Sequence, residues 1–66
     1  MKTNMYDRQI VLIIPNIGKW IGHNDEFVEE ESTARIFDSI IEADTYSAYI
    51  EHVLGVQCYA TLGKAK

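Results

Sequence analysis

Cysteine and proline are scarce in this sequence, and so are long apolar runs; each scarcity excludes a class of protein. Cys58 is the only cysteine, so no internal disulfide can form and a disulfide-stapled secreted miniprotein is excluded. The longest apolar run, Ile10 to Ile14, ends at the single proline, Pro15, and is too short to span a membrane. The acidic residue Asp7 lies shortly before that run, where a signal peptide would carry positive charge. We therefore expect a cytoplasmic protein that does not bind membranes.

Positive charge is also scarce. Six Lys and Arg residues stand against ten Asp and Glu, which gives a net charge of -4. Proteins that bind nucleic acid directly usually carry a basic stripe, and anionic membrane surfaces attract basic segments. The acidic balance argues against both and favours a protein partner, such as a nucleic-acid-handling enzyme with a basic groove.

The length of the chain limits its core. Its 66 residues, 47% of them hydrophobic, are sufficient for a single domain spanning residues 1–66, but a domain of this size has a thin core. A thin core leaves little room for the water-excluded pocket that most enzymes require. We expect a binding protein without a cofactor rather than an enzyme.

Strand signals dominate the first third of the chain. Residues 9–14 (QIVLII) are continuous and β-branched, which predicts a well-covered strand. Pro15 and Asn16 break this strand. Residues 19–21 (KWI) predict a second short strand, and the turn residues 22–25 (GHND) close it. Together these segments predict a hairpin.

The segment 26–37 permits two interpretations. Residues 26–33 (EFVEEEST) could form a helix with acids in its first turn, or an acidic loop that leads to a third strand over 34–37 (ARIF). Ser39 and Glu42 have the spacing of a capping box, which places a helix start at Ser39. A helix that begins there favours an extended approach, and therefore the loop and strand.

Residues 39–54 predict one helix, whose core-facing stripe is formed by Ala43, Tyr46, Ile50, Val53 and Leu54. Gly55 suits the left-handed residue after a helix. Residues 56–62 then alternate, with Cys58 on the apolar face of a last strand, and residues 63–66 are expected to be a frayed tail. The prediction is an α+β domain of order β-β-β-α-β, with a small, mostly antiparallel sheet and one helix packed on one face.

Residues 19–22 (KWIG), 27–29 (FVE), 34–39 (ARIFDS) and 56–62 (VQCYATL) together form a pattern that resembles small accessory proteins encoded by phages and prophages. The resemblance covers about two-thirds of the chain and is one of fold pattern. It implies a mobile-element accessory protein working in a host cytoplasm, and it implies no site residues.

Metal-binding and nucleophilic residues are few and separated. His23, His52 and Cys58 fall in different predicted elements, whereas zinc ligands usually occur in close pairs. We therefore expect no metal site. Cys58 lies on the predicted core face, which favours a small buried hydrophobe over a reactive thiol.

The acidic cluster is the most distinctive local feature, and it consists of Asp25, Glu26, Glu29, Glu30 and Glu31. Such a run is either a solvated loop or a negative patch that docks on a basic groove and imitates nucleic-acid phosphates.

Apolar residues outside the predicted core are the second set of candidates. Ile41, Ala48 and, at the margin, Tyr49 point away from the helix stripe, and Trp20 is either a cap on the open side of the sheet or a binding anchor. These features predict a phage-type inhibitor or modulator of a host protein that acts by steric and electrostatic occlusion. The alternative is a homo-oligomer, such as a homodimer, formed through the outer helix face or the sheet edges.

Overall fold

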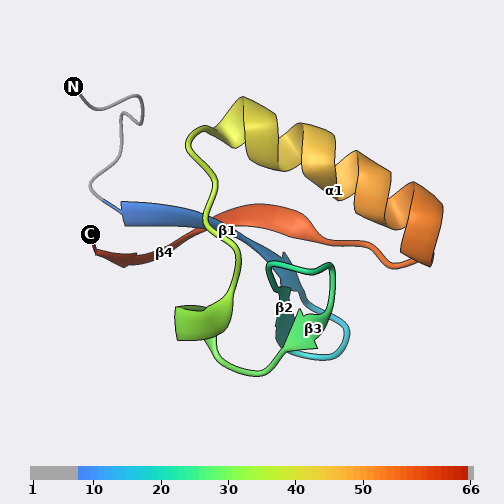
Figure 1. Cartoon of the computed structure of the whole chain (residues 1–66), viewed down its shortest axis with the longest axis horizontal. Coiled ribbons are helices and arrows are strands. Elements are labelled where there is room, and N and C mark those ends of the chain that lie inside the picture. The colour runs from blue at the N-terminus through green and yellow to red at the C-terminus, as the bar shows by residue number, and fades with distance from the viewer. Residues whose placement is uncertain (1–7, 66) are drawn as a thin grey trace.

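The computed structural model describes residues 8–65 and shows an α+β domain with one helix on a four-stranded antiparallel sheet (Figure 1). The elements follow the order β1 (Arg8–Ile14), β2 (Lys19–Ile21), β3 (Phe27–Val28), the 3-10 helix η1 (Glu31–Thr33), α1 (Ile40–Leu54) and β4 (Tyr59–Ala65). The strand order in the sheet is β3-β2-β1-β4. The predicted fold class is confirmed.

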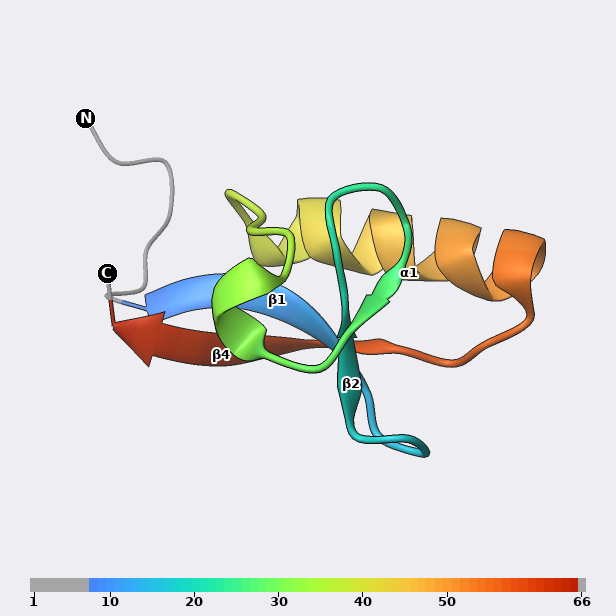
Figure 2. The same ribbon diagram turned by 60° about the horizontal axis from the view of Figure 1, so that its bottom comes forward.

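The central strand β1 is buried on the face toward α1 and, at Val11, on the other face as well. Ile10, Leu12 and Ile14 pack with Ala43 and Ile50 of α1 in the core. Side chains of a strand alternate between its faces, so Val11 points away from α1, and it is nevertheless fully buried. Figures 1 and 2 show η1 on the side of the sheet opposite α1, where it covers part of that face.

The third strand is not where the sequence pattern placed it. The strand that pairs with β2 is β3, with Trp20 opposite Val28, whereas residues 34–37 form only isolated bridges, Gly22 to Ala34 and Ile10 to Phe37, among the described residues. The reason is a tight turn directly after β2. It reverses the chain direction, so that Phe27 and Val28 pair with β2. Asp25 adopts a φ of 62° in this turn, a conformation that Asp tolerates better than most residues.

Residues 34–37 are nevertheless extended. They lie along the edge of β1 near Ile10, which β2 does not reach. The Phe37 N–H donates to the Ile10 carbonyl at 2.9 Å, and the Arg35 N–H donates to the Ile21 carbonyl at 2.9 Å. The interpretation of this segment as an extended approach to the helix is therefore confirmed, although it is not a continuous strand.

Both ends of α1 follow the predicted signals. Ser39 is the N-cap, and its Oγ accepts a hydrogen bond from the Glu42 N–H at 3.1 Å. The Glu42 carboxylate reaches back to the Asp38 N–H, one residue before the cap, at 3.1 Å. Gly55 ends the helix with a φ of 72°, which a residue with a Cβ adopts only with strain.

The last strand begins and ends later than predicted. β4 runs from Tyr59 to Ala65, so residues 63–65 belong to the sheet instead of a frayed tail, and Lys66 lies outside the described residues. Gly63 is buried, and a Cβ there would come within 2.1 Å of the Glu31 carboxylate. The predicted alternation holds, since Cys58 is buried while Tyr59 is exposed.

We predict that Ser39→Ala lowers the free energy of unfolding by about 1 kcal/mol, because the Glu42 N–H loses its capping partner. Urea denaturation monitored by circular dichroism measures this change. Ser32→Ala is the matched control, since Ser32 is an exposed serine of η1 and its replacement should leave stability within about 0.5 kcal/mol of wild type. Equal stability of all three proteins would contradict the capping role.

Candidate protein-binding surface

The helix exposes more large apolar side chains than it buries. Its buried residues are Ala43 and Ile50. Its exposed large hydrophobic residues are Ile41 (78% exposed), Tyr49 (48%), Val53 (54%) and Leu54 (42%). Ile41 and Tyr49 lie away from the buried stripe, Val53 lies at its margin, and Leu54 continues the stripe beyond the sheet. We call these four residues the outer helix surface. Exposed apolar side chains gathered on one element are typical of an interaction surface.

Val53 and Leu54 were expected in the core, and that expectation is wrong. The core stripe of α1 ends at Ile50 because the helix outlasts the sheet beneath it. β4 starts only at Tyr59, and Figure 1 shows the last turn of α1 extending past the beginning of this strand. The last turn therefore has no strand to pack on. Periodicity identified the apolar positions, but it could not show where the sheet stops.

The charges on α1 are all of one sign apart from a histidine. Residues 40–54 contain Glu42, Asp44 and Glu51 but no Lys or Arg, and these three acids are exposed. His52 lies in the last turn. The outer helix surface is therefore an apolar surface with an acidic border, and it complements an apolar patch that is bordered by cations.

Tyr46 holds the loop after β2 against α1. Its hydroxyl donates a hydrogen bond to the Asp25 carboxylate. The Arg35 guanidinium lies 4.4 Å from the centroid of the Tyr46 ring, within the range of a cation–π contact. The ring of Tyr49 lies 5.3 Å from that of Tyr46, centroid to centroid. This contact fixes the direction in which the exposed Tyr49 leaves the helix.

The Arg35–Tyr46 contact was not found in the sequence. Arg35 is a single cation between Ala34 and Ile36, in a segment expected to be a strand. An isolated cation in such a place is a signal for an aromatic or acidic neighbour. The Phe37 ring, 5.2 Å away, is two positions further along the chain, but Tyr46 is eleven positions further. Only the docking of α1 brings the two side chains together.

Two of the five acidic candidates, Asp25 and Glu26, have hydrogen-bond partners within the chain. Asp25 is bound to Tyr46. The Glu26 carboxylate accepts from the Asn24 N–H at 2.8 Å, within its own turn. These two side chains belong to the loop that faces α1, and both have intramolecular partners.

The other three acids, Glu29, Glu30 and Glu31, each have different surroundings. Glu29 pairs with Lys19 at 3.7 Å, an exposed pair that contributes little to stability. Glu31 lies against Gly63 of β4, and the Glu30 side chain is exposed. A docking role for the complete loop would need several of these contacts to break, so the acidic cluster remains a weaker candidate than the outer helix surface.

Trp20 belongs to a row of side chains on the face of the sheet opposite α1. Residues directly opposite each other in paired strands share a face, and Ile13 pairs with both Trp20 and Tyr59, while Trp20 pairs with Val28. Trp20, Ile13 and Val28 are half-buried, and Tyr59 is exposed. Trp20 is therefore held within the sheet surface, on the opposite side from Ile41 and Tyr49.

Cys58 is a buried thiol beside the helix. Its Sγ lies 4.0 Å from the Ser47 carbonyl oxygen. Burial, and to a smaller extent the Glu51 carboxylate, raises the pKa of the Cys58 thiol. A raised pKa disfavours the thiolate that nucleophilic chemistry requires, so Cys58 acts as a packing residue here.

We predict that Tyr46→Phe lowers the free energy of unfolding by about 1 kcal/mol, since the ring contacts stay while the hydrogen bond to Asp25 is lost. Tyr59→Phe is the control because Tyr59 is exposed and its hydroxyl donates only a long hydrogen bond, 3.5 Å, to the exposed Gln57 side chain; its stability should stay within about 0.5 kcal/mol of wild type. Denaturation curves measure both variants. If Tyr46→Phe were as stable as Tyr59→Phe, the Tyr46–Asp25 contact would not hold the loop.

Three further findings concern ligands and relatives. Within residues 8–65, no group of three His, Cys, Asp or Glu side chains is close enough to hold a metal ion. In the same part of the chain, no helix has the length and apolar character needed to cross a membrane. Comparisons with models of known protein families, with curated proteins and with solved structures gave no match.

Proposed function

We propose that this chain is a small acidic protein-binding module that docks through the outer helix surface. The observation that carries the proposal is the exposure of Ile41, Tyr49, Val53 and Leu54 on a helix whose buried residues are Ala43 and Ile50. A helix that served only to cover the sheet would have polar side chains at the positions of Ile41 and Tyr49, which lie outside the core stripe. An aromatic residue beside aliphatic ones is also the composition of an interface centre.

The partner that fits this surface is a protein with an apolar groove bordered by Lys and Arg. The acids of α1 would meet those cations at the rim, where opposite charges speed association and select the partner. A host enzyme that handles nucleic acid has such a basic groove, and docking there would occlude it. The activity we propose is therefore inhibition or modulation of a host protein, in the cytoplasm, where a single free cysteine stays reduced.

The test uses the tagged full chain as bait in a bacterial lysate. We expect a stoichiometric partner that is retained at low salt and weakened at moderate salt, since the rim charges are screened. The double variant Ile41→Ser/Tyr49→Ser should retain about tenfold less of this partner, because central apolar anchors dominate interface energies.

The matched control is Ile36→Ser, which removes another exposed isoleucine, 47% accessible, outside α1. It should bind the partner as wild type does. Retention of the same partner by wild type and the double variant would refute docking through the outer helix surface. Circular dichroism of each bait establishes that the substitutions leave the fold intact.

Self-assembly is the second candidate, and the sheet edge favours it. β4 is seven residues long and lies at the end of the strand order, with β1 as its neighbour on one side. Uncovered edge strands are ready to pair with another chain. Two copies joined through β4 would form one continuous antiparallel sheet.

Pairing through β4 predicts twice the monomer mass in sedimentation equilibrium. Thr61→Lys should reduce this mass to that of the monomer, because antiparallel pairing of two β4 strands about their midpoint at Leu62 places the two copies of residue 61 diagonally opposite each other, where like charges repel. Ile41→Asp serves as the control and should leave a β4-paired dimer intact. Dissociation by Ile41→Asp alone would assign the contact to the outer helix surface, and a monomer at all concentrations would exclude self-assembly.

A further inference from the structure

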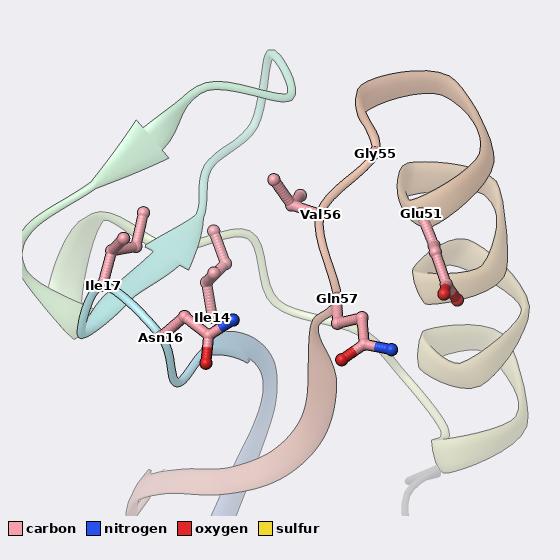
Figure 3. A pocket seen from close by; sticks show the side chains of 7 residues that line it. All are labelled: Ile14, Asn16, Ile17, Glu51, Gly55, Val56 and Gln57. Carbon is pink, nitrogen blue, oxygen red and sulfur yellow. The ribbon is translucent and has the colours of Figure 1, made fainter.

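A cleft lies at the end of the molecule where α1 meets the turn between β1 and β2. Its volume is about 540 Å³, within the usual range for ligand sites. Three segments line it: the β1–β2 side with Ile14, Asn16 and Ile17, the last turn of α1 with Glu51, and the connector to β4 with Val56 and Gln57 (Figure 3).

The cleft combines an apolar part with a row of polar groups. Ile14 is buried and Val56 half-buried, while Ile17 is half exposed. In Figure 3 the Gln57 side chain lies between those of Asn16 and Glu51. A ligand placed here would touch aliphatic carbon along one part of its length and meet amide and carboxylate oxygens along another.

The electrostatic character of the cleft is negative. The three Lys and Arg side chains whose contacts the structure describes are engaged elsewhere: Arg8 binds the Gly63 carbonyl, Lys19 pairs with Glu29, and Arg35 lies over Tyr46. Among the side chains that the structure describes, no cation pairs with Glu51. The C-terminal end of α1, at Leu54, adds the negative end of the helix dipole to the same region.

We propose that this cleft binds an arginine side chain of the partner protein. The proposal rests on the protein-binding function above and adds the chemistry of one contact. The aliphatic stem of arginine suits Ile17, which is half exposed, and the half-buried Val56. Its planar guanidinium presents five N–H donors and can reach the Glu51 carboxylate and an amide oxygen at once, which the compact ammonium of lysine does less well.

The test is a titration of the ¹⁵N-labelled full chain with N-acetyl-arginine N-methylamide, followed by NMR. We expect chemical-shift changes that saturate and are confined to the backbone amides of Asn16, Ile17, Gly55, Val56 and Gln57. Glu51→Gln should weaken binding about tenfold, because the charge-assisted hydrogen bond becomes a neutral one. Asp44→Asn is the matched control: it removes an exposed acid from the same helix outside the cleft, and it should bind the probe as wild type does.

Two analogues of the probe make the test specific. The citrulline analogue has the same shape as the arginine probe but no charge. The lysine analogue has the charge but no planar guanidinium group. Both should bind at least about tenfold more weakly than the arginine probe. Equal binding of all three probes, shifts outside the cleft, or unchanged binding to Glu51→Gln would each overturn the proposal. None of these outcomes would decide whether the outer helix surface binds a partner. That proposal is tested separately, by capture with the Ile41→Ser/Tyr49→Ser bait.

Discussion

The burial of β1, along one face and at Val11 on the other, is the constraint on which the rest of this structure depends. α1 covers one side through Ala43 and Ile50, η1 lies on the other, and Val11 is as fully buried as Ile10 and Leu12. β2 and β4 pair with its two edges, and Phe37 completes the part that β2 leaves open. Every other described element is thus placed by a contact with this strand or with its neighbours, as a chain with so little interior requires.

A core gathered around one strand leaves one side of the helix without a structural task. The side chains that α1 uses for packing lie on the other side: Ala43 and Ile50 are buried, and Ile40 and Tyr46 pack against the core as partly buried residues. Stability alone does not account for Ile41, which is 78% exposed, because a polar residue there would cost the fold little. The exposed apolar positions therefore point to a requirement outside the chain, and this reasoning favours a binding surface over a merely covered sheet.

Local signals in the sequence were sufficient for elements whose ends are determined by their own residues. Ser39, Gly55 and the break at Pro15 each act through the backbone next to them, and the alternation around Cys58 requires only that one face is buried. β3 could not be found in this way, because a two-residue strand has no periodicity and exists only through the turn at Asp25. The candidate site was partly predictable: Ile41 and Tyr49 are exposed as expected, whereas Val53 and Leu54 depend on where β4 begins, and the cleft unites residues about forty positions apart.

The outer helix surface and the cleft share the last turn of α1, and this proximity couples their energetics. Leu54 is exposed and lies three residues after Glu51, so the two side chains are neighbours on the helix surface. A partner that buries Leu54 therefore also removes water from around that carboxylate. Loss of water strengthens the attraction between Glu51 and a cation, but it raises the cost of leaving the carboxylate unpaired. A partner with an arginine at this point would gain from apolar contact, while a partner of the same shape without one would lose much of that gain. One uncompensated acid beside an apolar surface can therefore select among partners that the apolar surface alone would accept.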